Sequence, residues 1–172
     1  MTIPQGKNQR WSLDFVSDAM TDGRRFRILT VVDDITRECL ALVADTSLSG
    51  LRVARELDAL IARRDKPLMI VSDNGPEFIS KELDIWAFMK GITLDFSRPG
   101  KPTDNAFIES LNGKFRAECL NVSWFMSLDE AREKCEDWRR DYNMVRQHSA
   151  IGNQVPARLH LPVGSPGQLT VG

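Results

Sequence analysis

The stretch IVSDNGPEFIS, from Ile70 to Ser80, decides how the fold is read, because it joins a short apolar segment to an acid and a turn. Residues 67–71 have the length and composition of a buried strand, and Gly75-Pro76 is a turn signal that opens a helix. In open α/β sheets, the carboxyl end of a strand faces the crevice where ligands bind. Asp73 is therefore either part of a site or simply the acid of an Asx turn or helix cap, and the stretch alone leaves both open.

Composition indicates one domain with a full hydrophobic core, since the chain has 172 residues and 42% of them are hydrophobic. No apolar run approaches the roughly 20 residues of a membrane span, and the first residues lack the apolar core of a signal peptide. We therefore expect a cytoplasmic protein without a membrane partner. The three cysteines are far apart and only two histidines are present, which argues against a zinc site and predicts reduced core cysteines: Cys39, Cys119 and Cys135.

The overall charge argues against a protein that binds nucleic acid by bulk positive charge. The formal net charge is −1 and the pI about 6.1, whereas such domains usually have a pI above about 9. Three short basic clusters, at 24–25, 63–66 and 139–140, are typical of solvated faces. Any nucleic-acid contact must therefore be local.

The order of periodic segments predicts an α/β fold: a mixed five-stranded sheet, with three antiparallel strands followed by parallel strands, flanked by helices. The expected domain boundaries are an N-terminal extension over 1–9, a core over 10–160 and a C-terminal tail over 161–172. The expected elements are strands at 11–16, 26–32, 38–44, 68–71 and 92–96, and helices at 48–64, 77–90, 104–120 and 127–144, with a loop at 97–103.

The expected helix over 104–120 has two distinct stripes, since residues three and four apart share a face. Its apolar stripe contains Ile108, Leu111, Phe115 and Cys119, and its polar stripe contains Asn105, Glu109, Asn112 and Arg116. Glu109 has no cation four residues on, where Gly113 stands. Glu109 is either an ordinary surface acid or a functional residue.

Three acids stand at suggestive places in this arrangement: Asp14 on the first strand, Asp73 after the fourth, and Glu109 on the later helix. Carboxylates, water and substrate phosphate are the oxygen ligands that Mg²⁺ or Mn²⁺ prefers. Two such ions about 3.5–4 Å apart would activate the attacking oxygen and stabilise the leaving oxygen in phosphoryl transfer. The sequence contains no Gly-x-Ser-x-Gly elbow, Gly-rich phosphate loop or zinc motif that would offer another chemistry.

Five ordered segments of the chain resemble the integrase catalytic core of IS3-type insertion-sequence transposases, which is related to retroviral integrases. They are WSLDFVSD, VVDDITRECLAL, IVSDNGPEF, PGKPTDNAFIESLNGKFRAECL and YNMVRQHSAIG. The resemblance covers roughly residues 10–159. Between Asp73 and Glu109 lie residues 74 to 108, which is 35 residues, the spacing that names the DD(35)E group.

The resemblance implies a ribonuclease-H-like fold and a DNA transposase that nicks DNA and transfers the freed strand to a target. It implies that Asp14, Asp73 and Glu109 are both the catalytic and the metal-binding residues, and that two Mg²⁺ or Mn²⁺ ions bind when DNA is present. The implied partners are DNA, as transposon ends and target, and further copies of the chain in at least a dimer. A cytoplasmic enzyme of this kind would be associated with the bacterial nucleoid when bound to DNA.

The remaining polar residues near the triad have secondary roles in this interpretation. Asp18 and Asp33-Asp34 are expected to be turn and solubility residues, and Asp104 a helix cap. Asn74 and Gly75 are expected to shape the turn that presents Asp73. The candidate DNA contacts are Asn105, Asn112, Arg116, Lys114, Lys101 and Arg98.

The sequence departs from the family at two points. Gln147 replaces the proline that usually precedes the histidine of the last segment, here His148, and we expect little effect because the three acids are unchanged. Complete transposases of this kind carry helical DNA-binding segments upstream, so we expect a catalytic core or a truncated copy. One alternative is a catalytically silent fragment that acts as an assembly module, and another is a nuclease of the ribonuclease H type.

Overall fold

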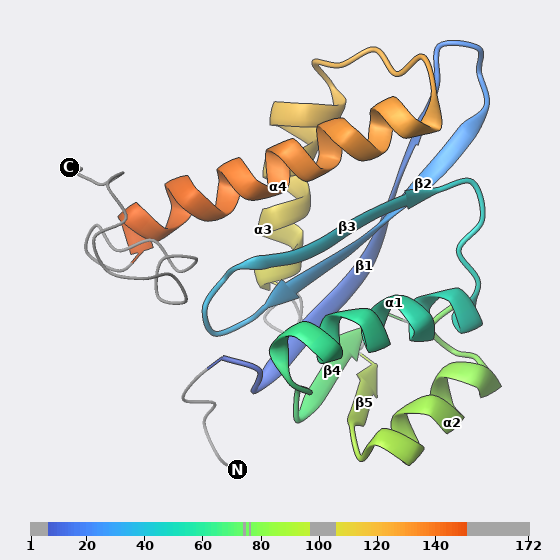
Figure 1. Ribbon diagram of the computed structural model, residues 1–172, viewed down its shortest axis with the longest axis vertical. Coiled ribbons are helices and arrows are strands. Elements are labelled where there is room, and N and C mark those ends of the chain that lie inside the picture. Colours follow the sequence, from blue (N-terminus) through green and yellow to red (C-terminus); the bar gives the residue numbers. More distant parts are fainter. Residues whose placement is uncertain (1–6, 74, 76, 97–105, 151–172) are drawn as a thin grey trace.

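The computed structural model describes residues 7–73, 75, 77–96 and 106–150, and it contains a five-stranded sheet between two layers of helices (Figure 1). The strand order is β3-β2-β1-β4-β5, with β1 antiparallel to β2 and parallel to β4. This is the predicted order of three antiparallel strands followed by parallel ones. The strands are β1 (Arg10–Ala19), β2 (Arg25–Asp33), β3 (Cys39–Asp45), β4 (Met69–Ser72) and β5 (Thr93–Phe96).

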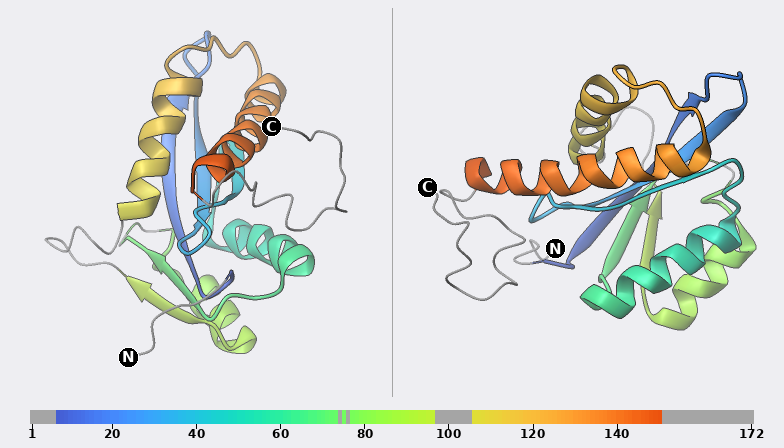
Figure 2. Two further views of the ribbon diagram at one scale, coloured as in Figure 1. Left: turned by 90° about the vertical axis from the view of Figure 1, so that its left-hand side faces the viewer. Right: turned by 45° about the horizontal axis from the view of Figure 1, so that its top comes forward.

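The helices lie in pairs on the two faces of the sheet, with α1 and α2 on one face and α3 and α4 on the other (Figure 2). Their bounds are α1 (Gly50–Arg64), α2 (Lys81–Lys90), α3 (Ala106–Phe115), the π-helical turn η2 (Arg116–Leu120) and α4 (Leu128–Ala150). No helix among the described residues is long and apolar enough to cross a membrane.

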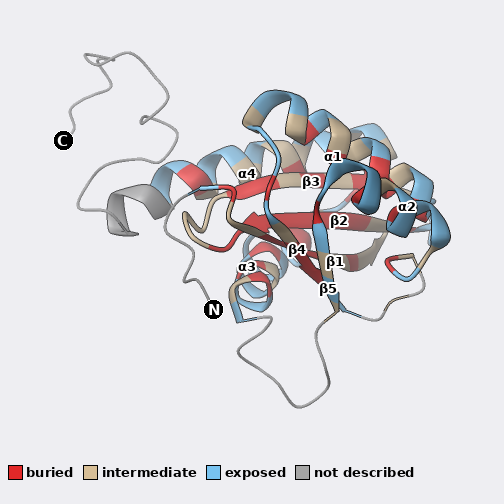
Figure 3. Cartoon of the chain, turned by 90° about the horizontal axis from the view of Figure 1, so that it is seen from below, coloured by how far each residue is buried: buried red, intermediate tan, exposed pale blue. Residues whose placement is uncertain are grey.

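Alternation along β1 divides the core into two clusters, because successive side chains of a strand point to opposite faces. Trp11 and Leu13 pack under α1 and α2, whereas Val16 packs under α3 and α4. Figure 3 shows the buried residues concentrated in the strands and the inward faces of the helices. Asp14 has the parity of Val16, so it lies on the face that α3 covers.

Ser80 is the N-cap of α2, so the helix begins at Lys81 rather than at residue 77 as expected. The Ser80 hydroxyl accepts a hydrogen bond from the backbone N–H of Leu83. Serine is favoured at the N-cap because its side chain satisfies a backbone N–H of the first helical turn that would otherwise have no partner. At the other end, Gly91 adopts a left-handed conformation (φ 72°) and closes the helix as predicted. Met89, near the end of α2, is exposed although it is apolar.

The helix expected over 104–120 and the one expected over 127–144 also differ in the structure. The α-helical part ends at Phe115 and the chain continues as the π turn, while α4 extends to Ala150. Residues 127–130, SLDE, have the pattern of a capping box at the start of α4, and half of it is formed: the Glu130 N–H donates to the Ser127 hydroxyl. The Glu130 carboxylate accepts from the N–H of Met126 rather than from that of Ser127.

Asp33 and Asp34 are buried, so the expectation of solubility residues was wrong. Asp33 accepts hydrogen bonds from the backbone N–H groups of the following turn and pairs with Arg64. Asp34 accepts from the Ser12 hydroxyl and pairs with Arg10. A buried acid is tolerated because each carboxylate has several donors, which a sequence pattern does not reveal.

Candidate active site

Asp14 stands in the middle of β1, and the pairing of β1 with β4 brings it level with Asp73. Arg10 pairs with Met69 and Ser12 with Val71 in a parallel register. Extending that register by two residues aligns position 14 with position 73 on neighbouring strands, which lie about 4.8 Å apart in a sheet. The acid inside one strand and the acid after the other therefore meet at the same edge.

Asp73 follows the last residue of β4 and its side chain is exposed. Its Oδ1 accepts a hydrogen bond of 2.9 Å from the backbone N–H of Gly75, so the Asx turn considered for this stretch is present. A Cβ on Gly75 would lie 3.0 Å from the same Oδ1, which explains why glycine fits there. Asn74 lies outside the described residues.

The segment after Asp73 is fixed to the sheet by contacts that the sequence analysis did not identify. Arg27 of β2 forms an ion pair of 3.0 Å with Glu77 and lies over the ring of Phe15. That ring in turn stacks on Phe78 at 4.8 Å between centroids. Glu77 and Phe78 belong to the stretch at 70–80 that the sequence singles out. Their contacts could not be predicted from it, because their partners Arg27 and Phe15 are distant in sequence.

Glu109 and Asn112 project from the α3 face next to β1, since they lie three residues apart. Asn112 Nδ2 donates a hydrogen bond of 2.9 Å to Asp14 Oδ2, whereas the backbone N–H of Phe15 donates to Oδ1. Asn112 therefore orients the Asp14 carboxylate, a role that differs from the expected contact with DNA. The Asn112 Oδ1 atom is buried without a partner among the described residues.

The electrostatics of Asp14 link the three acids. The pKa of Asp14 is raised from 3.8 to about 6: burial is the largest cause and the negative charges of Asp73 and Glu109 add to it, while hydrogen bonds from the Phe15 N–H and Asn112 oppose it. Asp73 and Glu109 thus both lie within the electrostatic reach of Asp14.

This donor set fits a hard divalent cation, because it consists of carboxylates and an unpaired amide oxygen. In the described ranges, no three His, Cys, Asp or Glu side chains converge closely enough to form a preformed metal cluster. Asp73 and Glu109 are both exposed, so water and a substrate phosphate have room to complete the coordination.

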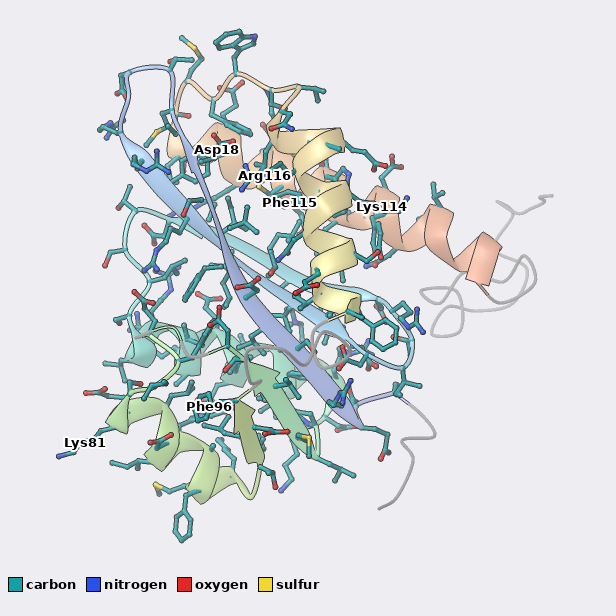
Figure 4. The ribbon with its side chains drawn as sticks, turned by 180° about the vertical axis from the view of Figure 1, so that it is seen from behind. Asp18, Lys81, Phe96, Lys114, Phe115 and Arg116 are labelled. Carbon is teal, nitrogen blue, oxygen red and sulfur yellow. The ribbon has the colours of Figure 1, made fainter. Side chains whose placement is uncertain are left out.

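The residues proposed to contact DNA are distributed over both sides of α3. Arg116 donates to the carbonyl of Ser17 and lies toward β1, whereas Lys114 lies on the other side of the helix, toward α4 (Figure 4). The other three candidates lie outside the described residues: Asn105, Lys101 and Arg98.

Comparison with known proteins identifies the family. Two models of the Integrase core domain match the chain, over residues 4–102 and 90–156. A 31.7 kDa protein of insertion element IS407 from Burkholderia multivorans is 50% identical over 157 residues, which cover 91% of this chain and 57% of that protein. A 39.2 kDa protein of insertion element IS476 from Xanthomonas euvesicatoria is 49% identical, with 88% of this chain and 44% of that protein covered. The chain spans about half the length of these relatives.

Solved structures support the fold. The HTLV-2 integrase catalytic core domain, solved with magnesium in a trimeric form, superposes with a TM-score of 0.63 at 19% identity and covers 87% of this chain and 95% of that one. Its dimeric form gives 0.59 at 20% identity, with 90% and 95% covered. The sheet order and the flanking helices are those of the ribonuclease-H-like fold. The chain therefore belongs to the integrase core domain family, whose insertion-element members it matches over nearly its whole length.

Proposed function

We propose that this chain is the catalytic core of a DNA transposase that nicks DNA and joins the freed strand to a target by metal-dependent phosphoryl transfer. The observation that carries the proposal is the convergence of the three acids: the register of β1 and β4 brings position 73 level with Asp14, Asn112 of α3 bonds Asp14, and the charges of Asp73 and Glu109 both act on Asp14. An enzyme keeps such electrostatic repulsion where a bound cation or a charged substrate relieves it.

In this mechanism Asp14, Asp73 and Glu109 hold Mg²⁺ or Mn²⁺, with two ions expected once DNA is bound. A bound cation supplies charge neutralisation at the phosphate and lowers the pKa of the attacking oxygen. Asn112 and the Phe15 N–H fix both oxygens of Asp14. The Asx turn at Gly75 fixes Asp73, and α3 carries Glu109. The chain needs no side-chain nucleophile, since water and then the 3′-hydroxyl of DNA attack.

The test is the joining of a labelled, pre-cut terminal-repeat duplex to plasmid DNA, with Mg²⁺ or Mn²⁺. The wild-type chain is compared with Asp73→Asn and Glu109→Gln, and Asp84→Asn, an exposed acid of α2, is the matched control. We expect joining by the wild type and by the control, and a loss of at least 100-fold in the other two. Joining that survives Asp73→Asn would refute the proposal, and hybrid cleavage without joining would assign the chain to the nucleases.

We further propose that the chain works as a homo-oligomer of at least two copies, since transposition requires two DNA ends to be held together. The dimeric and trimeric forms in which the HTLV-2 core was solved support this proposal. Light scattering after size-exclusion chromatography, with and without terminal-repeat DNA, tests it. A monomer under both conditions would contradict it.

A further inference from the structure

A cavity of about 440 Å³ lies between α3 and α4, on the side of α3 away from the acids. Phe107, Ser110 and Lys114 line it from α3, and Trp138 and Tyr142 line it from α4. At 100° per residue, Phe107 and Lys114 lie about 160° and 140° around the helix from Glu109, and Ser110 lies about 100° from it. This space is therefore separate from the proposed metal site, although it shares a helix with it.

The walls of the cavity are aromatic. Trp138 and Tyr142 stack with their centroids 4.9 Å apart and an interplanar angle of 22°. The ring of Phe107 is covered by the Arg37 guanidinium, 3.5 Å from its centroid. Flat aromatic and guanidinium surfaces of this kind stack with nucleobases.

Two cations and two acids line the cavity: Arg37 and Lys114, and Glu118 and Asp141. Glu118 is engaged by the Trp138 indole N–H at 3.1 Å and by Lys114 at 4.0 Å. Arg37 and Lys114 are the groups that would take a phosphate beside such a base. Arg37 also has a left-handed backbone (φ 65°), a conformation that residues other than glycine adopt only at a cost in free energy. That conformation accompanies the placement of its side chain over Phe107.

The solvent face of α3 connects the two sites. The side chains between the Glu109 side and the Lys114 side are small and exposed: Ala106, Gly113 and Ala117. A DNA strand that leaves the acids can therefore approach the helix backbone closely as it crosses to the cavity. Side chains from two motif segments that contribute none of the three acids, Arg37 and Tyr142, also meet at this cavity.

We propose that this cavity binds one unpaired nucleotide of the DNA strand that crosses α3, with the base between the aromatic walls and the phosphate at Lys114 and Arg37. The proposal rests on the proposed function for the origin of that strand. It requires an unpaired nucleotide because in a duplex the faces of each base are covered by its neighbours.

The experiment is an NMR titration of the ¹⁵N-labelled chain with a short single strand of mixed sequence and, separately, with the blunt-ended duplex that this strand forms with its complement. The readout is the indole N–H signal of Trp138, assigned by its loss in Trp138→Phe. We expect it to shift with the single strand, with at least tenfold weaker binding of the duplex, while the Trp86 indole, bonded to Asp58, stays unchanged. The proposal would be overturned if the Trp138 indole signal did not shift with the single strand, or if it shifted equally with both probes.

Two variants test the cavity directly. Ser110→Phe fills it from an exposed helical position, and Arg37→Gly removes the guanidinium at a backbone conformation that glycine prefers. Both should weaken single-strand binding at least fivefold, whereas Glu133→Phe, an exposed site on α4 outside the cavity, should not. Wild-type affinity in Ser110→Phe would contradict the proposal.

The two proposals fail separately, since the titration uses no metal and no cutting. If Asp73→Asn still joins DNA, the proposed function falls and the cavity proposal is judged by the titration alone. If the wild type joins DNA but the Trp138 signal does not move, the cavity proposal falls alone.

Discussion

At the scale of single residues, the raised pKa of Asp14 links the candidate site to the stability of the fold. Its pKa is about 6 in the folded chain and near 3.8 when unfolded, so folding favours its protonated form. The stability that this provides is complete below about pH 4 and is lost as the pH rises through 6. Without a metal, Asp14 therefore destabilises the fold at neutral and alkaline pH.

The first prediction is that Asp14→Asn abolishes joining but stabilises the metal-free chain at pH 8. A shift of about 2 pKa units corresponds to about 3 kcal/mol, and we expect about 1–2 kcal/mol because the side chain is partly solvated. Urea denaturation of the wild type and the variant in EDTA, at pH 8 and pH 4, measures the difference in their free energies of unfolding. This difference should vanish toward pH 4, and an equal stabilisation at both pH values would contradict the explanation.

The second prediction concerns Asn112, which acts through Asp14 as a positioning residue. Asn112→Ala removes a hydrogen bond that lowers the pKa of Asp14, so that pKa rises further. Since a metal requires the ionised form, the acidic limb of the pH–rate profile should move to higher pH. Joining should fall roughly tenfold at pH 7, with partial recovery at pH 8.5. A uniform loss at every pH would indicate a structural role only.

At the scale of elements, the helix ends and helix contacts decide which glycines are required. Gly50, the first residue of α1, lies against Ser80, the N-cap of α2, and a Cβ there would meet the Ser80 side chain and come within 3.1 Å of the Glu77 carbonyl oxygen. Gly113 is also helical, but a Cβ there would meet nothing within 4 Å. The same substitution should therefore have opposite effects at the two sites.

The third prediction compares the substitutions Gly50→Ala and Gly113→Ala. Gly50→Ala should lower the free energy of unfolding by about 1–3 kcal/mol because it displaces the cap of α2. Gly113→Ala should raise it by about 0.5–1 kcal/mol because alanine favours the helix. Thermal and urea unfolding of the two variants measure both values. A lower free energy of unfolding in Gly113→Ala than in the wild type would show that the solvent face of α3 is covered.

At the scale of the whole molecule, one buried amide joins the last helix to the sheet. Asn143 of α4 accepts a hydrogen bond from the Cys39 N–H at 2.8 Å and donates one to the Cys39 carbonyl at 3.0 Å. Cys39 begins β3, 104 residues earlier. The YN pair of the last motif thus has two functions in the structure, since Asn143 holds α4 and its neighbour Tyr142 lines the cavity.

The fourth prediction is that Asn143→Leu lowers the free energy of unfolding by about 1–3 kcal/mol, because it removes the acceptor of the buried Cys39 N–H, whereas the Cys39 carbonyl keeps its hydrogen bond from Arg139. Asn121→Ala, at an exposed position after η2, should stay within about 0.5 kcal/mol. Urea unfolding measures both, and equal effects would show that burial of Asn143 does not matter. Loosening of α4 should also weaken single-strand binding in the cavity.

The sequence by itself determined the element order, the three-then-two arrangement of strands, the reduced core cysteines and the family, because periodicity, turn residues and motif spacing are local properties. It also identified Asp14, Asp73 and Glu109 as the candidate acids, which stays a prediction. The tertiary structure alone decided which groups surround them: the register that aligns positions 14 and 73, the bond from Asn112 to Asp14, and the burial of Asp33 and Asp34. These depend on pairing between distant segments, and a side chain's charge state and partners follow from that packing rather than from its neighbours along the chain.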